Sequence, residues 1–242
     1  MIRRQSALEN PAAQDTTELD HLRHYYDARA DSYDEIYRRN DPLRQGELAA
    51  IASDARRTLA GRHVLEVACG SGYWTRLVAE QAASITAVDT SMAMLARAVA
   101  TCRGSACARF VACDAFALDA LSAIFDGGLC MFWLSHVPRA LLAVFLDGFH
   151  RRLRPGAAVI MADNVHVDDV GGLRVDRPGR LDGFKRRTLP DGSVHEIIKN
   201  YFDESELCSL FQPFADEVRI EVGQCYWSAV YSVSRRSGPS RA

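Results

Sequence analysis

Short apolar runs alternate with segments of helical period through the middle of the chain, and this alternation limits the folds that the chain can adopt. The apolar runs are HVLEVA (63–68), SITAVD (84–89), ARFVACD (108–114), GGLCMFW (127–133) and AAVIMAD (157–163). Helical spacing of apolar residues covers 73–82, 91–101 and 138–152. Strands that are apolar on both faces and separated by helices are typical of a parallel sheet covered on both sides. The sequence therefore predicts an α/β fold.

Glycine and proline mark the expected ends of these elements. LRPGA (153–157) predicts a helix end followed by a tight turn into the fifth strand, and DGG (126–128) predicts a break before the fourth. Pro42 is expected to start a helix that ends before Gly61.

The flanking segments have their own patterns. Residues 17–39 carry tyrosines at positions 25, 26, 33 and 37, a helical spacing with a break near 31–32. Residues 164–202 lose the regular pattern and are expected to form an insertion above the carboxyl edge of the sheet, where open α/β sheets bind ligands. A helix at 203–211 and two strands within 218–233, turning at Gly223, are expected to follow.

Composition excludes several classes of function. The 242 residues suit one domain or one domain with a modest cap, and a hydrophobic share of 48% is enough for a core. A net charge of -2, spread along the chain, predicts no general attraction to nucleic acid or anionic lipid. The apolar runs are far shorter than the roughly 18 residues that cross a membrane, and the N-terminus has no apolar signal-peptide core. We expect a cytoplasmic protein without a membrane partner.

The cysteines and histidines show no metal-binding spacing. Seven cysteines, an odd number, form no CxxC pair, and most lie in apolar runs. The histidines form no HxxxH pair on a helix. Reduced, buried thiols and no metal site are therefore expected.

Residues 64–75, VLEVACGSGYWT, place two glycines between the first strand and the next helix. Glycine there lets a ligand approach backbone N–H groups without a Cβ in the way. No lysine follows, as a phosphate-binding Walker A loop requires, and Thr75 stands where a dinucleotide fingerprint has its third glycine. The carboxylate of Glu66 would also repel a pyrophosphate. The loop therefore favours a ligand with a positively charged end.

S-adenosylmethionine has an ammonium, a sulfonium and no phosphate, and so meets this requirement. The sequence resembles the class I S-adenosylmethionine-dependent methyltransferases, whose first motif is (E/D)-x-G-x-G-x-G. Residues 66–72 match this motif, with Ala68 at the first glycine position. The resemblance implies a Rossmann-like, doubly wound, mostly parallel seven-stranded sheet with N-terminal helices and a small cap after the fifth strand.

The resemblance also implies a domain layout. A flexible lead (1–16) precedes one methyltransferase domain (17–236), and a tail (237–242) follows it. The parts of the domain are expected to be a helical lid (17–60), a cofactor-binding core (61–163), a substrate cap (164–202) and a C-terminal helix with antiparallel strands (203–236).

The carboxyl ends of later strands match the family in the same order. The resemblance implies that S-adenosylmethionine, converted to S-adenosylhomocysteine, is bound by Glu66, Ala68, Gly70, Gly72, Asp89, Thr90, Met94, Asp114, Ala115 and Phe132. Asp89 follows the glycine loop by about 20 positions, where a carboxylate accepts ribose hydroxyls, and Asp114 is placed to accept the adenine amino group. Taken alone, Asp89 and Asp114 would also suit helix N-caps, and Glu66 would suit a buried pair with an arginine.

Methyl transfer from a sulfonium is an in-line displacement, in which alignment of the reacting atoms can supply about 7 kcal/mol or more. A base is needed only if the acceptor must lose a proton early. His136, just after the fourth strand, is the first candidate for that role, with capping of the next helix as the alternative. By resemblance the stretch YYDARADSYD (25–34) closes over the site, and Tyr33 is its candidate catalytic residue. Candidate substrate contacts are Trp133, Asn164, His166 and Tyr226.

The acceptor class is predicted from what the sequence lacks. FWLS (132–135) stands where enzymes that methylate DNA or amide nitrogen often have an NPPY-like motif, and KRR (185–187) is balanced by nearby acidic residues, as on a solvated face. An aromatic pocket is expected from Phe184, Tyr201, Tyr226 and Trp227. We therefore expect a monomer or homodimer that methylates O, N or C of a small aromatic or heteroaromatic metabolite. A tRNA or protein methyltransferase and a non-catalytic cofactor-binding protein are the alternatives.

Overall fold

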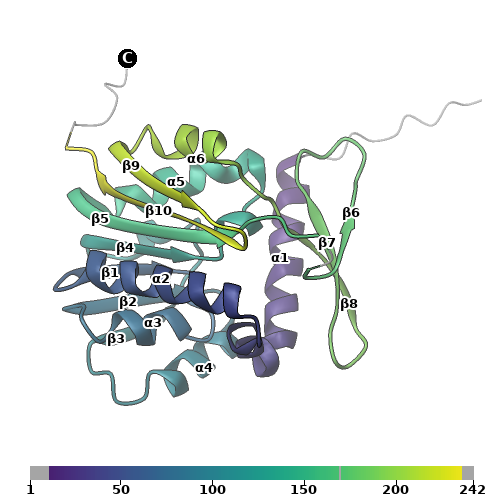
Figure 1. The fold of residues 1–242 in the computed structure, drawn as a ribbon, viewed down its shortest axis with the longest axis horizontal. Coiled ribbons are helices and arrows are strands. Elements are labelled where there is room, and N and C mark those ends of the chain that lie inside the picture. Colours follow the sequence, from purple (N-terminus) through teal and green to yellow (C-terminus); the bar gives the residue numbers. More distant parts are fainter. Residues whose placement is uncertain (1–10, 169, 236–242) are drawn as a thin grey trace, which may run out of the picture.

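A central sheet of seven strands organises the structure, a computed structural model that describes residues 11–168 and 170–235 (Figure 1). Its strands are β1 (His63–Val67), β2 (Ser84–Asp89), β3 (Ala108–Ala112), β4 (Phe125–Met131), β5 (Leu153–Asn164), β9 (Ala215–Val222) and β10 (Tyr226–Val233). Their order is β3-β2-β1-β4-β5-β10-β9, with β1 to β5 parallel and with β9 and β10 paired antiparallel. The predicted doubly wound, mostly parallel sheet is thereby confirmed.

Helices cover both faces of this sheet. The α-helices are α1 (Pro11–Arg29), α2 (Pro42–Leu59), α3 (Tyr73–Val78), α4 (Met92–Thr101), α5 (Leu142–Arg151) and α6 (Glu204–Phe211). Short 3-10 helices are η1 (Ala30–Arg38), η2 (Leu118–Ala120), η3 (Leu134–His136) and η4 (Arg139–Leu141). Residues of α2, α3 and α4 share one apolar core, which includes Leu59 and Trp74, and residues of α5 and α6 share another, which includes Phe149 and Phe211.

The order of the strands reverses at β1, which pairs with β2 on one side and with β4 on the other. Connections that leave β1 and β4 therefore lead to opposite faces and open a crevice at the carboxyl edge, which is where doubly wound sheets bind ligands. The loop after β1 carries the glycine motif, and the loop after β4 carries Phe132, Trp133 and His136.

The predicted break at DGG (126–128) is wrong, because Gly127 and Gly128 lie inside β4. A Cβ on Gly127 would lie 3.0 Å from Cγ2 of Val64, and one on Gly128 would lie 2.7 Å from Cζ of Phe149. The glycines therefore leave room for Val64 of the adjacent strand β1 and for Phe149 of helix α5. LRPGA likewise belongs to β5, so the predicted tight turn is wrong. Instead the pairing of β5 with β4 shifts register there, since Phe125 pairs with Leu153 but Gly127 pairs with Ala158.

The N-terminal lead is shorter than expected. Helix α1 begins at Pro11, so residues 11–16 are helical rather than a flexible extension; proline suits the first turn of a helix. Asp15 anchors this end, because its buried carboxylate accepts from Arg180 at 2.8 Å. Residues 1–10 and the predicted tail (237–242) lie outside the described residues.

The insertion at 164–202 folds into a separate three-stranded antiparallel sheet. Its strands are β6 (Leu173–Val175), β7 (Phe184–Thr188) and β8 (Val194–Ile198). Helix α1 stands between this sheet and the central one (Figure 1). Leu22 and Tyr25 of α1 form a small apolar core with Leu189 and Ile197. The insertion therefore faces the carboxyl edge across α1.

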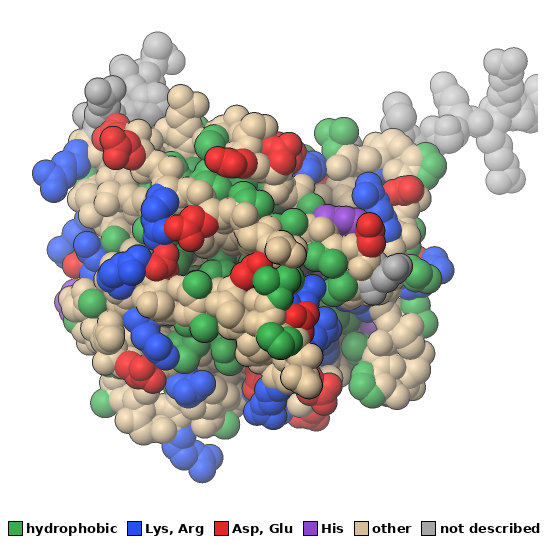
Figure 2. All heavy atoms as spheres, viewed as in Figure 1, with side chains coloured by type: hydrophobic (Ala, Val, Ile, Leu, Met, Phe, Trp, Pro, Cys, Tyr) green, Lys and Arg blue, Asp and Glu red, His purple; other side chains and the backbone are tan. Residues whose placement is uncertain are grey.

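Charges of both signs are interspersed over the face shown in Figure 2. None of the helices that the structure describes is long and apolar enough to cross a membrane. All seven cysteines are free thiols; Cys69, Cys102, Cys130 and Cys225 are buried as expected, whereas Cys208 is exposed.

Candidate active site

The loop after β1 is held in an uncommon backbone conformation. Gly70 and Gly72 have φ of 54° and 78°, which glycine adopts without strain, but Ala68 also has φ of 55°. Phe132, after β4, has φ of 59°. Within the described ranges, Ala68 and Phe132 are the non-glycine residues that have a positive φ. This conformation costs each of them about 1–2 kcal/mol of conformational free energy. Such strain is concentrated at binding sites, and both residues line the same cavity.

This loop cavity, of about 400 Å³, lies between the carboxyl edge of the sheet and α1. The predicted residues that line it are Ala68, Gly70, Asp89, Thr90, Met94, Asp114, Ala115 and Phe132. On the opposite side, α1 contributes Leu19, Leu22 and Tyr26. The ends of four adjacent strands, β3, β2, β1 and β4, thus meet at one cavity, as the motif order predicts.

Asp89 shapes the loop. Its Oδ2 accepts from the backbone N–H of Gly70 at 2.8 Å, and its Oδ1 accepts from that of Ser91 at 2.9 Å. Burial raises the pKa of Asp89, and these N–H groups oppose the rise. The N-cap of α4 is Ser91, whose Oγ accepts from Met94 N–H, so the alternative that Asp89 caps the helix is wrong. Asp114 caps no helix either, since its Oδ1 accepts from Phe116 N–H within the loop after β3.

Glu66 and Gly72 line neither this cavity nor the one beside it, unlike the other predicted cofactor residues. The Glu66 side chain is buried behind the loop, and its Oε2 accepts from Thr75 Oγ1 at 2.6 Å. Within the described part of the chain no arginine pairs with it, so the ion-pair alternative is wrong. Gly72 serves packing: a Cβ there would lie 2.9 Å from Cα of Ala98.

Burial raises the pKa of Glu66 to about 8, so the ligand-free protein holds this carboxyl largely protonated at neutral pH. Because the folded pKa exceeds the unfolded one, the stability that the protonated carboxyl provides is present below about pH 4.5 and is lost as the pH rises through about 8. Glu66→Gln should remove this loss and be more stable than the wild type at about pH 8, by up to about 4 kcal/mol, since each pKa unit corresponds to about 1.4 kcal/mol.

Urea unfolding at about pH 5 and about pH 8 measures this effect. The control is Glu80→Gln, which changes a largely exposed carboxylate and should leave the profile of the wild type unaltered. Parallel pH profiles for Glu66→Gln and the wild type would contradict the prediction.

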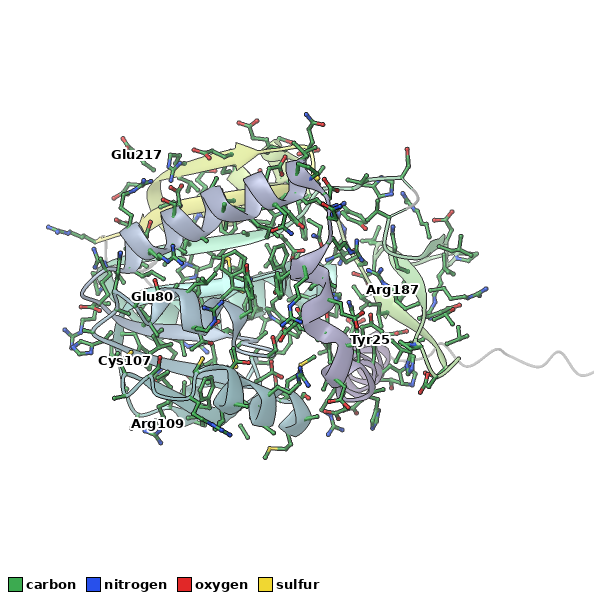
Figure 3. The ribbon with its side chains drawn as sticks, turned by 60° about the horizontal axis from the view of Figure 1, so that its bottom comes forward. Tyr25, Glu80, Cys107, Arg109, Arg187 and Glu217 are labelled. Atoms are coloured by element: carbon green, nitrogen blue, oxygen red, sulfur yellow. The ribbon has the colours of Figure 1, made fainter. Side chains whose placement is uncertain are left out.

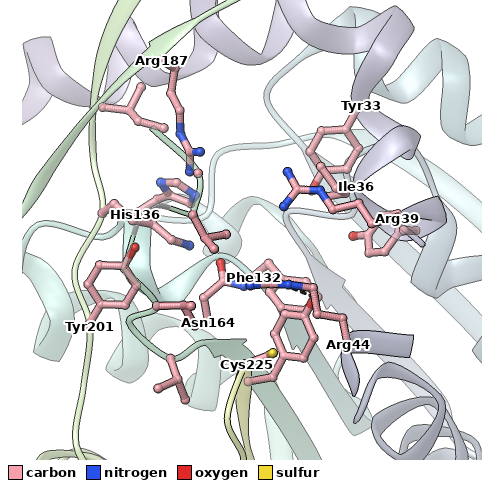
Figure 4. A pocket seen from close by; sticks show the side chains of 18 of the residues that line it. Tyr33, Ile36, Arg39, Arg44, Phe132, His136, Asn164, Arg187, Tyr201 and Cys225 are labelled. Carbon is pink, nitrogen blue, oxygen red and sulfur yellow. Dashed lines mark hydrogen bonds between the residues drawn. The ribbon is translucent and has the colours of Figure 1, made fainter. Parts of the chain in front are cut away.

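A second, smaller cavity of about 110 Å³ opens beside the first (Figure 4). We call it the arginine cavity; its lining includes Arg29, Arg39, Arg44, Arg187 and Lys199. Tyr26, Tyr33, Phe132 and His136 line both cavities. The predicted catalytic residues His136 and Tyr33 therefore lie at the boundary between them.

The predicted substrate residues divide between the two cavities. Asn164 and Tyr226 line the arginine cavity, and Trp133 lines the loop cavity instead. His166 lines neither, since its ring packs edge-on against Tyr201 with centroids 4.9 Å apart.

The predicted aromatic pocket is only half right. Tyr201 and Tyr226 line the arginine cavity. Trp227 is fully buried in the core, where its ring packs beside Phe211. Phe184 is covered by Arg177, whose guanidinium carbon lies 3.9 Å from the centroid of the Phe184 ring. In each strand only alternate side chains can face the cavity.

His136 is held in one orientation. Its Nδ1 lies 2.7 Å from the carbonyl oxygen of Ile198, which can only accept, so Nδ1 carries the proton. Nε2 then accepts from the hydroxyl of Tyr26 at 2.9 Å. Burial, with the charge of Lys199, lowers the pKa of His136 to about 3. The ring is therefore neutral, and its two hydrogen bonds connect Tyr26 of α1 to Ile198 of β8. It does not cap the following helix, as the alternative expected.

Comparison with known proteins agrees with this geometry. Residues 64–156 match a family model described as a methyltransferase domain. The ubiquinone biosynthesis O-methyltransferase of Pseudomonas paraeruginosa is 33% identical over 112 residues, which is 45% of this chain and 47% of that one. The chain spans about half the length of the curated relatives that it matches.

Solved structures match over more of the chain. DhpI, in a complex with SAH, superposes with a TM-score of 0.72 and 26% identity over 90% of this chain and 98% of the other. Residues 64–156 are thus similar to a methyltransferase domain, and the chain as a whole resembles S-adenosylmethionine-dependent methyltransferases in fold. A Burkholderia thailandensis 1,6-didemethyltoxoflavin-N1-methyltransferase shares the fold of this chain at 19% identity, with a TM-score of 0.57 over 95% of this chain and 93% of the other.

Sequence reasoning missed the basic residues that line the second cavity. KRR (185–187) was expected to form a solvated face, which is right for Arg186 alone: it is exposed and binds Glu196 at 2.6 Å. Lys185 is buried and donates to the Val170 carbonyl, and Arg187 lines the arginine cavity. Strand alternation within β7 was the available signal. Figure 3 shows Arg187 and Tyr25 on the side where α1 meets the insertion.

Proposed function

We propose that the protein transfers the methyl group of S-adenosylmethionine to a small organic acceptor. One observation carries the proposal: the loop cavity and the arginine cavity meet at Tyr26, Tyr33, Phe132 and His136. A donor held in the first would present its reactive end toward an acceptor held in the second. Alignment of two reactants in this way is the main requirement of an in-line displacement.

The loop cavity fits the cofactor by its chemistry. The backbone around Gly70 is open to a ligand, because a Cβ there would meet only the ring of Tyr33, 3.7 Å away. Asp89 and Asp114 would accept hydrogen bonds from the ribose and the adenine amino group, and Met94 would pack beside the base. When bound, S-adenosylmethionine supplies the activated methyl group. The protein's own residues bind it, orient the acceptor and exclude water.

For the acceptor, we propose O, N or C of a small aromatic or heteroaromatic molecule. The small volume of the arginine cavity and the rings of Phe132, Tyr201 and Tyr226 support this. The O-methyltransferase of ubiquinone biosynthesis is a relative with a small-molecule pathway in its name. We further propose a cytoplasmic monomer or homodimer that uses neither a nucleic acid nor a resident metal. In the described ranges no three or more His, Cys, Asp or Glu side chains form a metal-binding group.

Radiolabelled methyl transfer tests this function. S-adenosylmethionine with a tritiated methyl group is incubated with fractionated small-molecule extract, and separately with total tRNA and with protein. Label in a low-mass compound supports the proposal. Label only in a macromolecule would overturn the acceptor class, and tight cofactor binding without any transfer would favour a non-catalytic protein.

Removing a hydroxyl at the boundary of the cavities should slow transfer without weakening cofactor binding. Tyr26→Phe deprives His136 Nε2 of its donor, and Tyr33→Phe removes the hydroxyl of a partly buried ring beside Gly70. We expect turnover to fall about tenfold or more while the affinity for S-adenosylhomocysteine stays within about twofold. Tyr73→Phe, at a position that lines neither cavity, is the control. Unchanged single-turnover rates would remove both tyrosines from the catalytic machinery.

A further inference from the structure

The arginine cavity concentrates positive charge. Four arginines and Lys199 line it, and no aspartate or glutamate does so among the residues that the structure describes. Figure 4 shows Arg187 reaching in from β7, opposite Arg39 and Arg44. Charges of one sign in a partly enclosed cleft reinforce one another and raise the local concentration of ligands of the opposite sign.

Two of these cations already have a carboxylate partner. Lys199 Nζ lies 3.0 Å from Asp163, and Arg44 Nε lies 3.1 Å from Asp41. For the guanidinium groups of Arg29, Arg39 and Arg187, the described part of the chain places no carboxylate within 4.0 Å. Within the described ranges, the charge of these three is therefore not balanced by a neighbouring carboxylate.

The nearby arginines outside the cavity are different. Arg177 binds Glu18 and Glu196, Arg180 binds Asp15 and Asp182, and Arg139 binds Glu206. Each lies in the same part of the molecule, so a shortage of acidic residues does not explain the unbalanced set. Arg139, Arg177 and Arg180 thus each have a carboxylate partner, whereas Arg29, Arg39 and Arg187 of the cavity wall have none among the described residues.

One of the three unbalanced arginines is held in place, and another has an unsatisfied donor. Arg29 donates to the hydroxyl of Tyr25 at 2.8 Å and lies 5.3 Å from the ring centroid of Tyr33. Arg187 has its Nε buried without a hydrogen-bond partner. A buried donor without a partner costs free energy unless a ligand satisfies it. The planar guanidinium group can donate two parallel hydrogen bonds to the two oxygens of a carboxylate, phosphate or phosphonate.

The cofactor does not account for this charge. S-adenosylmethionine carries one carboxylate, which can neutralise one guanidinium, and its sulfonium adds a positive charge of its own. At least two arginines of the cavity would still lack an anion. Arg39 and Arg187 line the arginine cavity and not the loop cavity, so they face the acceptor side.

We propose that the methyl acceptor is an organic oxyanion, with a carboxylate, phosphate or phosphonate group bound by Arg39 and Arg187 and with the remaining part of the molecule directed to the Tyr26–His136 boundary. This inference rests on the proposed function and specifies its substrate class. It refines the aromatic acceptor expected from the sequence: a ring is accommodated if it carries such a group.

Anion binding to the protein loaded with S-adenosylhomocysteine tests the inference separately from turnover. Isothermal titration uses methylphosphonate, inorganic phosphate and benzoate, with catechol as the neutral probe and choline as the cationic one. We expect at least one oxyanion to bind more tightly than catechol and choline by about tenfold or more, and increasing salt to weaken it. The oxyanion that binds best distinguishes a carboxylate acceptor from a phosphorus-based one.

Matched variants locate the binding groups. Arg187→Met and Arg39→Met should each weaken the best oxyanion by about tenfold while S-adenosylhomocysteine affinity stays within about twofold. Arg186→Met, at the adjacent exposed position paired with Glu196, should change neither. Arg39 is exposed, so its variant keeps the test valid if Arg187→Met fails to fold.

The failures of the two proposals look different. If S-adenosylhomocysteine binds but no oxyanion exceeds the neutral probe, the acceptor inference is overturned and the proposed function stands. If oxyanion binding survives both arginine variants, the assignment to this cavity is overturned. If S-adenosylhomocysteine does not bind at all, the proposed function itself fails.

Discussion

Replacing Lys199 by methionine is expected to lower the free energy of unfolding by about 3–5 kcal/mol, because it leaves a buried carboxylate without its cation. Lys199 and Asp163 are 4% and 0% exposed, and Nζ of Lys199 also donates to Ser135 Oγ. Burial alone would raise the pKa of Asp163, but the charge of Lys199 and the N–H groups of Ser135 and Asn164 lower it below its usual range. Asp163 is therefore ionised, and its carboxylate is not exposed to solvent that could replace Lys199.

Urea unfolding followed by tryptophan fluorescence measures the loss. Lys185→Met is the matched control: Lys185 is also buried but donates only to a carbonyl, so its removal should cost at most about 1 kcal/mol. The double variant Asp163→Asn/Lys199→Met should lose clearly less than the sum of its single variants, because it removes both charges. Additive losses would show that the two side chains do not depend on each other.

Asp89→Ala is expected to weaken the binding of S-adenosylhomocysteine by about 100-fold. The carboxylate holds the loop through Gly70 N–H and is the proposed acceptor for the ribose hydroxyls, and each hydrogen bond to a charged group contributes about 1.5–3 kcal/mol. The affinity of Asp89→Asn for S-adenosylhomocysteine should lie between those of the wild type and Asp89→Ala, because the asparagine amide keeps one accepting oxygen.

Isothermal titration with S-adenosylhomocysteine provides the measurement, with a thermal melt to show that each variant is folded. Asp126→Ala is the matched control, since Asp126 also accepts from a backbone N–H, that of His63, but at the opposite edge of the sheet. Equal affinities for Asp89→Ala and Asp126→Ala would exclude Asp89 from the cofactor site.

The parts of the fold that follow local rules were predictable. Strands β1 and β2 and helices α2 and α4 lie within about two residues of their predicted bounds, since apolar period and capping residues act over short distances. Gly127 and Gly128 were misread because the same residue type marks turns and close packing. Only the positions of Val64 and Phe149, far away in the sequence, distinguish the two uses.

The candidate site divides in the same way. Ala68, Gly70 and Asp89 could be placed because each follows a strand at a fixed spacing from a recognisable motif. The arginine cavity could not, because it combines Arg29 from α1, Arg39 from the end of η1 and Arg187 from β7. No sequence spacing relates these residues, and their approach depends on how the insertion packs against α1. Their meeting is a property of the tertiary structure.

Helix α1 is a shared wall: Leu19 and Leu22 face the loop cavity, Arg29 faces the arginine cavity, and Tyr26 faces both. A ligand in either cavity would therefore contact the same helix, so any ordering of α1 by the first ligand would lower the entropy cost of binding the second. Donor and acceptor affinities are then thermodynamically linked, and linkage is reciprocal: the factor by which one ligand tightens the other is the same in both directions. Because both proposed ligands would contact this one helix, we expect the affinity of each to depend on the presence of the other.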